Sequence, residues 1–288
     1  MMTYRSVAHL IDANPTSDGD GLALHRAFPN PSLRELDPFL LLDHLGPTLL
    51  APGEARGFPP HPHRGFEAVT YLLSGEMQHR DSWGNHGILG PGDVQWMTAG
   101  SGLVHSEQPG ETLMREGGTL HGFQLWVNLP KRRKMQAPRY QDTRAASIPV
   151  VRNGDGTVTV KVIAGEAMGA SGVIDTEIPI RYLHITLAPG SRCELPLPRR
   201  DHAFAFVVSG EVDLNGTVAR KNQTAIFDRG GENVTISNPG VADAELLLLA
   251  GEPVGEPVVR YGPFVMNSKA EIVQAMDDFR AGRMGTLQ

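Results

Sequence analysis

Two short motifs combine side chains that bind metals. His61-Pro62-His63 and His105-Ser106-Glu107 each place two potential ligands two positions apart. Alternate side chains of an extended strand project from one face, so each motif presents its two side chains together. If the two segments are neighbouring strands of one barrel, three imidazoles and one carboxylate converge in its interior. Such a set suits a divalent first-row metal, with positions left for water or substrate.

The other histidines give weaker signals. Seven of the eleven histidines lie between residues 44 and 121. We interpret His79, His86 and His121 as surface or core residues. His44, in the segment LLDHLGP, is compatible with the same pocket or with the core, and the sequence leaves both readings open.

Short apolar segments separated by turn residues predict an all-β fold. Ala68–Leu73 precedes Ser74-Gly75, and Phe204–Val208 precedes Ser209-Gly210; similar runs recur along the chain. Many short strands at this spacing indicate a β-barrel or sandwich. Long amphipathic helices do not alternate with these runs, which argues against a parallel α/β fold.

One helix is predicted near the C-terminus. Ser268 and Glu271 form a capping box, and Gly282 stands where a C-terminal glycine is expected. The apolar residues between these signals share one helical face. They are Ile272, Val273, Met276 and Phe279. We expect this face to pack on the outside of a barrel.

An internal repeat predicts two similar domains. Phe66–Glu76 resembles Asp201–Glu211, and Gly92–Gly100 resembles Asn222–Gly230 in the same order. A polar, proline-containing stretch separates the copies, so we predict domains at residues 1–135 and 136–288. In the second copy these alignments replace the four candidate ligands by Pro196, Pro198, Thr235 and Ser237. The prediction is therefore one metal site, in the N-terminal domain.

Composition excludes several classes of protein. The 288 residues carry a formal net charge of −6, which argues against nucleic acid or an anionic membrane as the main partner. A single cysteine, Cys193, excludes an intramolecular disulfide and multi-cysteine metal sites. The first residues lack the pattern of a secretory signal, so we expect a cytoplasmic protein. Two domains supply enough core for a monomer.

The sequence resembles the pirins, a two-domain family of the cupin superfamily. The segments that carry the resemblance are HPHRGFEAVTYLLSGE (61–76), PGDVQWMTAGSGLVHSE (91–107), HGFQLWVNLP (121–130) and GEPVGEPVVRYGPFVMN (251–267). The resemblance implies two tandem jelly-roll-like cupin barrels, the second one degenerate and without metal ligands. It also implies His61, His63, His105 and Glu107 as ligands of one metal ion, with Fe(II) first and Zn, Mn, Ni, Co or Cu as alternatives.

Two functions follow from this resemblance. Some pirins act as quercetin 2,3-dioxygenases, opening flavonols with O2 and releasing CO; Glu107 would then be the catalytic base. Phe58, Phe66, Trp96 and Trp126 are candidates to stack on a planar substrate, or are simply core. Other pirins are iron-dependent, redox-sensing regulators that act through protein partners. For the basic run Lys131–Lys134 we favour a solvated loop over a contact to an acidic partner.

Overall fold

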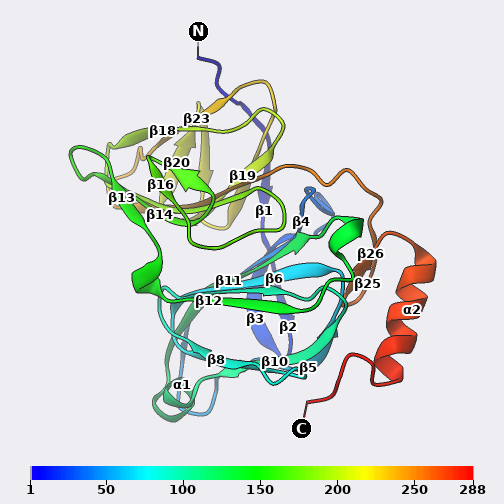
Figure 1. Cartoon of the computed structure of the whole chain (residues 1–288). Coiled ribbons are helices and arrows are strands. Elements are labelled where there is room, and N and C mark those ends of the chain that lie inside the picture. Colours follow the sequence, from blue (N-terminus) through cyan, green and yellow to red (C-terminus); the bar gives the residue numbers. More distant parts are fainter. Residues whose placement is uncertain (1, 288) are drawn as a thin grey trace. The chain divides into compact units, whose positions relative to one another are not determined.

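Strands form almost all of the regular structure in residues 2–287, which the computed structural model describes (Figure 1). The chain divides into two compact units, which we call the first and the second barrel. The first barrel comprises residues 15–26, 39–145 and 254–287, and the second comprises residues 2–14, 27–38 and 146–253. The outer ends of the two predicted domains, Met1 and Gln288, lie outside the described residues.

The first barrel contains a seven-stranded and a four-stranded antiparallel sheet. The larger sheet has the order β12 (Arg139–Thr143), β9 (Val94–Thr98), β6 (Phe66–Ser74), β11 (Gly118–Asn128), β4 (Phe39–Leu50), β3 (Leu22–Phe28) and β2 (Asn14–Asp18). The smaller has the order β5 (Phe58–His63), β10 (Leu103–Pro109), β7 (Met77–Asp81) and β8 (His86–Leu89). A short helix, α1 (Glu111–Glu116), and a 3-10 turn, η1 (Lys131–Arg133), complete it together with the C-terminal segment described below.

The second barrel repeats this strand order. Its larger sheet has the order β1 (Val7–Asp12), β22 (Gln223–Phe227), β19 (His202–Ser209), β24 (Ala244–Gly251), β17 (Ile180–Leu187), β14 (Val158–Ala164) and β13 (Val150–Arg152). Its smaller sheet has the order β18 (Arg192–Pro196), β23 (Asn233–Ser237), β20 (Glu211–Leu214) and β21 (Thr217–Arg220). A short ribbon joins β15 (Glu166–Ala167) to β16 (Ala170–Ser171), and η2 (Ala145–Ser147) precedes β13. The repeated segments occupy the same places: β6 matches β19, and β9 matches β22.

Each barrel also includes a segment from the opposite end of the sequence. Strand β1 pairs with β22 of the second barrel, with Leu10 opposite Ala225. The C-terminal elements β25 (Val259–Tyr261), β26 (Phe264–Met266) and α2 (Lys269–Arg280) belong to the first barrel. These units differ from the contiguous division at residues 135 and 136, because the repeat locates strands but not where the chain ends pair.

Helix α2 begins and ends where the sequence predicts. The Ser268 side chain caps it by accepting a hydrogen bond from the Glu271 amide, and Gly282 follows with φ of 72°. Ile272 and Ala275 are buried, whereas Val273 and Phe279 of the predicted apolar face are 56% and 40% exposed. The helix is therefore confirmed, but its buried face is narrower than the apolar pattern suggests.

Two buried cations fasten the C-terminal segment to the first barrel. Arg64 Nη1 donates to Asp278 Oδ2 of α2 at 2.7 Å, and Arg64 Nε donates to the Ser101 carbonyl at 2.7 Å. Lys134 Nζ donates to three acceptors, the Gly65 and Val265 carbonyls and the Asn128 amide oxygen. Lys134 is only 1% exposed, so the last residue of the predicted basic loop is a buried structural cation. Within residues 2–287, no helix is both long and apolar enough to cross a membrane.

Candidate metal centre

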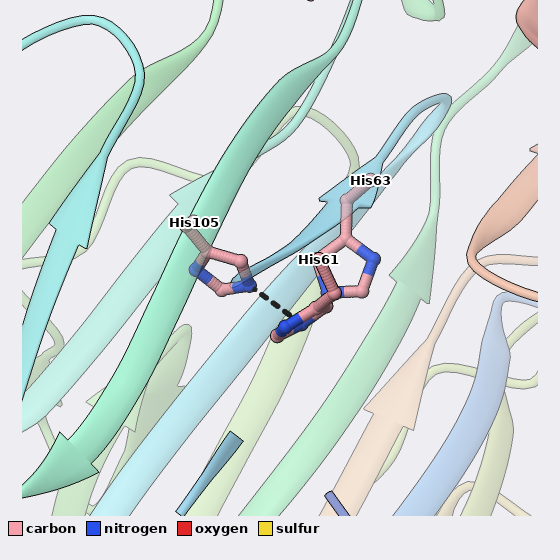
Figure 2. A group of neighbouring side chains, drawn as sticks. All are labelled: His61, His63 and His105. Carbon is pink, nitrogen blue, oxygen red and sulfur yellow. Dashed lines mark hydrogen bonds between the residues drawn. The ribbon is translucent and has the colours of Figure 1, made fainter. Parts of the chain in front are cut away.

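Three histidines from two neighbouring strands meet inside the first barrel (Figure 2). Strands β5 and β10 are antiparallel, with His105 opposite His61 and Leu103 opposite His63. The Nε2 atom of His61 lies 2.9 Å from His63 Nε2 and 3.0 Å from His105 Nε2. The sequence prediction that these three imidazoles converge is therefore correct in the structure.

The backbone decides the tautomer of His61. Its Nδ1 lies 2.8 Å from the Pro59 carbonyl oxygen, which can only accept a hydrogen bond. His61 Nδ1 therefore carries the proton in the neutral ring, and Nε2 presents a lone pair to the other two rings. Orientation of a ligand histidine through its other nitrogen is the usual arrangement in metal sites.

Burial keeps the other two rings neutral. The pKa of His63 lies well below its ordinary value because of burial first and the neighbouring His61 second. The pKa of His105 is likewise well below its ordinary value, because of burial and the nearby His63 and His61. Neutral imidazole is the form that binds metals. Three converging neutral rings cannot all donate to one another, so a cation that accepts their lone pairs fits this group.

Glu107 lies near the histidines but outside the group whose ligand atoms lie within 4.8 Å of one another. Its Oε1 is 2.8 Å from Thr70 Oγ1, and its Oε2 is 3.5 Å from Gln124 Nε2. Thr70 Oγ1 is also 2.7 Å from Gln124 Oε1, so its single proton serves one of two acceptors at a time. The carboxylate is thus held in a buried group of hydrogen-bonded side chains, and its role as a fourth metal ligand stays a prediction.

A cavity of about 480 Å³ is lined by His61 and His63 of the histidine group, but not by His105. Its polar lining consists of Asp18, Asp43, His61, His63, Glu107, Gln124 and Arg260. Its apolar lining consists of Leu41, Phe58, Pro59, Pro60, Trp126 and Pro263. Four polar lining residues, Asp18, Asp43, Gln124 and Arg260, were not predicted from the sequence. Arg260 and Pro263 lie some two hundred residues after the histidine motif, and no local pattern connects them with it.

Two arginines act at this cavity in different ways: Arg260 belongs to its lining, whereas Arg26 contacts the lining residues Asp18 and Asp43. Arg26 donates to both Asp43 oxygens at 2.8 and 2.7 Å and to Asp18 at 2.7 Å. The hydrogen bond with Asp43 is the main cause of a raised pKa of Arg26. The Arg260 guanidinium instead lies over the Trp126 ring, 4.5 Å from its centroid. Trp126 in turn meets His63 edge-on, with ring centroids 5.2 Å apart.

The remaining aromatic and histidine candidates divide between lining and core. Phe58 and Trp126 line the cavity, whereas Phe66 and Trp96 are fully buried and absent from its lining. His44 is also absent from the lining, and its Nε2 lies 2.8 Å from His121 Nε2. His79 is buried and interacts with Asp142 at 3.2 Å.

The second barrel has apolar side chains where the first has histidines. Strands β18 and β23 correspond to β5 and β10, and they pair Cys193 with Ile236 and Leu195 with Val234. Leu195, Val234 and Ile236 belong to the buried core, and Cys193 packs against it. The inward-facing counterparts of His61, His63 and His105 are therefore Cys193, Leu195 and Ile236. The sequence alignment was wrong by three positions for Pro196 and Pro198 and by one position for Thr235 and Ser237, because the intervening turns differ in length. Burial raises the pKa of Cys193 to about 12, so its thiol stays protonated.

These features define a protein of two cupin barrels with a histidine cluster in one of them. The Pirin family description matches residues 21–127, and the Pirin C-terminal cupin domain matches residues 182–285. A pirin-like protein of Caulobacter vibrioides is 43% identical over 284 residues, covering 98% of this chain and 100% of the relative. Human pirin is 42% identical over 290 residues, which cover 99% of this chain and 96% of human pirin.

A solved structure agrees with this assignment. The crystal structure of quercetin 2,3-dioxygenase from Acinetobacter baumannii superposes with a TM-score of 0.94 at 36% identity. The superposition covers 99% of this chain and 100% of the Acinetobacter chain. The chain belongs to the pirin family. The predicted all-β fold with two cupin barrels and a short C-terminal helix is confirmed.

Proposed function

We propose that this protein is a metal-dependent dioxygenase of the quercetin 2,3-dioxygenase type. It would open the heterocycle of a flavonol with O2 and release CO. The observation that carries the proposal is the three-histidine group, because two of its members, His61 and His63, line a cavity together with Phe58 and Trp126. The structural similarity to a protein named for this activity supports it.

In the proposal, His61, His63 and His105 hold one divalent metal ion, with Fe(II) first among the candidates. When bound, the metal would supply Lewis acidity toward the substrate oxygens and the means to react with O2. The Pro59 carbonyl keeps the His61 lone pair directed at the metal position. Burial of His63 and His105 keeps these ligands deprotonated over the physiological pH range.

Glu107 is the proposed general base and fourth ligand. Its carboxylate faces the cavity and would accept the proton of the flavonol 3-hydroxyl. Thr70 and Gln124 are positioning residues, because their hydrogen bonds hold the carboxylate beside the histidines. Phe58 and Trp126 would flank the planar substrate and exclude water from the reacting atoms.

Loss of the quercetin absorbance band in air tests the proposal. The protein is first stripped of metal and then reloaded with Fe(II), Mn(II), Ni(II), Co(II), Cu(II) or Zn(II) in separate samples. We expect metal-dependent loss of the band with release of one CO per flavonol consumed. Stoichiometric metal with no turnover for any ion would overturn the proposal and favour the regulatory function, which partner capture would then address.

A further inference from the structure

We infer that Arg260 selects planar aromatic substrates that carry a carboxylate away from their metal-binding oxygens. The inference rests on the proposed function, because it concerns the substrate of the same cavity. It goes beyond that function by naming a charged substituent that the substrate should have. Arg260 lies in the segment 251–267 that carries the family resemblance, where no role was predicted for it, and it belongs to the C-terminal strand β25.

The position of Arg260 carries the first step. It lines the cavity beside Gly262 and Pro263, and its guanidinium lies 4.5 Å from the Trp126 ring centroid. Its Nη1 also donates to the Leu40 carbonyl at 3.4 Å. Trp126 also contacts His63 edge-on, with ring centroids 5.2 Å apart, so the guanidinium, the indole and the proposed ligand histidine are linked along one wall. A planar ligand that reaches the histidines along this wall would end near Arg260.

The charges of the cavity carry the second step. Asp43 and Asp18 accept three hydrogen bonds from Arg26, which offsets much of their negative charge. Arg260 is the positively charged member of the cavity lining, and it lies over Trp126. The wall formed by Trp126 and Arg260 is therefore the side of the cavity that favours an anion.

The chemistry of guanidinium identifies the anion. The planar fork of N–H donors in arginine matches the two oxygens of a carboxylate, while its face stacks on an aromatic ring. Stacking on Trp126 fixes the plane of the guanidinium before a ligand arrives, which lowers the entropic cost of binding. An aromatic carboxylate would use both features, with its ring beside Trp126 and its oxygens at Arg260.

A matched pair of ligands tests the inference by binding alone. We would measure the Kd values of 3-hydroxyflavone and of its 4′-carboxy derivative by calorimetry with zinc-loaded protein, since zinc has no redox chemistry. We expect the wild type to bind the carboxylate about tenfold more tightly, as for one charge-assisted interaction. R260M should abolish this preference while changing the Kd of 3-hydroxyflavone less than threefold, and R260K should retain part of it.

Two controls complete the design. R115M removes an arginine whose side chain is 66% exposed on α1, outside the cavity lining, and should keep the wild-type preference. The inference would be overturned if R260M kept the preference for the carboxylate, if it lost affinity for both ligands equally, or if neither ligand bound to the protein. A preference that depends on Arg260, together with no flavonol turnover by the iron-loaded protein, would support the inference and overturn only the proposed dioxygenase activity.

Discussion

The two barrels share one strand order, but the interior of the first contains a cluster of histidines whereas that of the second is apolar. Each combines a seven-stranded sheet with a four-stranded sheet, and corresponding strands occupy corresponding places. In the first barrel, His61, His63 and His105 meet beside a cavity of about 480 Å³. In the second, the corresponding strand pair contributes Leu195, Val234 and Ile236 to a continuous apolar core. The cupin backbone therefore permits a metal site without requiring one.

The difference lies in a few inward-facing positions. Polar side chains line the cavity in the first barrel and are held by hydrogen bonds, as Glu107 and Gln124 are by Thr70 behind them. In the second barrel, the apolar side chains at equivalent positions pack against each other, which is the favourable state for an interior without polar groups. We expect changes at these positions to separate metal binding from stability.

The largest effect should come from removing a proposed metal ligand of the first barrel. His63→Ala leaves two histidines, and we expect its metal content to fall from one ion to below about a tenth of an ion per chain. Metal analysis after dialysis measures this loss. His9→Ala is the control, because His9 is an exposed histidine on β1 of the second barrel. Full metal content in His63→Ala would contradict the assignment of the site.

The next largest effect should be on turnover. Glu107→Gln keeps the size of the side chain and one acceptor oxygen, but it replaces the other oxygen by an amide nitrogen and so removes the proposed base. We expect flavonol turnover to fall about a hundredfold or more, while part of the metal binding is retained. Turnover of metal-replete protein, compared with that of the wild type, measures the effect. Equal rates at equal metal content would rule out Glu107 as the base.

A reciprocal exchange between the barrels should affect stability. Ile236→His places an imidazole in the apolar core, and we expect local stability of the second barrel to fall by about 3 kcal/mol. His105→Ile places an apolar group at the corresponding position of the first barrel. Because His105 Nδ1 is buried without a hydrogen-bond partner, this change should alter the stability of the metal-free protein by about 1 kcal/mol or less.

Different probes report on each barrel in this exchange. All three tryptophans, Trp83, Trp96 and Trp126, belong to the first barrel, so their fluorescence during urea unfolding follows that unit. Hydrogen exchange of the β19 and β24 amides follows the second. If Ile236→His and His105→Ile lowered the stability of their barrels equally, the two interiors would not differ in their preference for apolar side chains.

The smallest effect should be the response of α2 to acid. Burial by itself raises the pKa of Asp278, but hydrogen bonds from Arg64, Gln274 and Arg283 outweigh it and lower the pKa to about 2. Because the carboxyl pKa is lower in the folded state than in the unfolded state, ionised Asp278 stabilises the fold fully at pH values above the unfolded pKa of 3.8. This contribution is lost as the pH falls through the folded pKa of about 2. The protection of the α2 amides, measured relative to their intrinsic exchange rates at each pH, should therefore fall between pH 4 and pH 2.

The matched variant is Asp278→Asn, which should already show faster exchange at pH 6 and a smaller change on acidification. We expect the ionised pair with Arg64 to contribute about 2 kcal/mol at pH 6. The buried apolar cluster of the second barrel supplies the amides that serve as the internal reference. An α2 response identical in wild type and Asp278→Asn would show that this ion pair is not its cause.

Local patterns in the sequence determined much of this protein. Alternation within HPH and HSE places potential ligands on one face of a strand, and turn residues mark where strands end. The capping box at Ser268 fixed the start of α2 because its hydrogen bonds join residues three apart. Each of these signals depends on neighbours in the chain, so each can be recognised without the fold.

Only the tertiary structure decided which distant segments complete each barrel. Strand β1 pairs in the second barrel, while β25, β26 and α2 join the first, where Arg260 and Pro263 line the cavity. It also decided that Glu107 rests against Thr70 and Gln124, and that Cys193, Leu195 and Ile236 replace the histidines. These outcomes depend on backbone pairing between residues far apart in sequence and on the space left by packed side chains. Neither quantity is encoded in a local pattern.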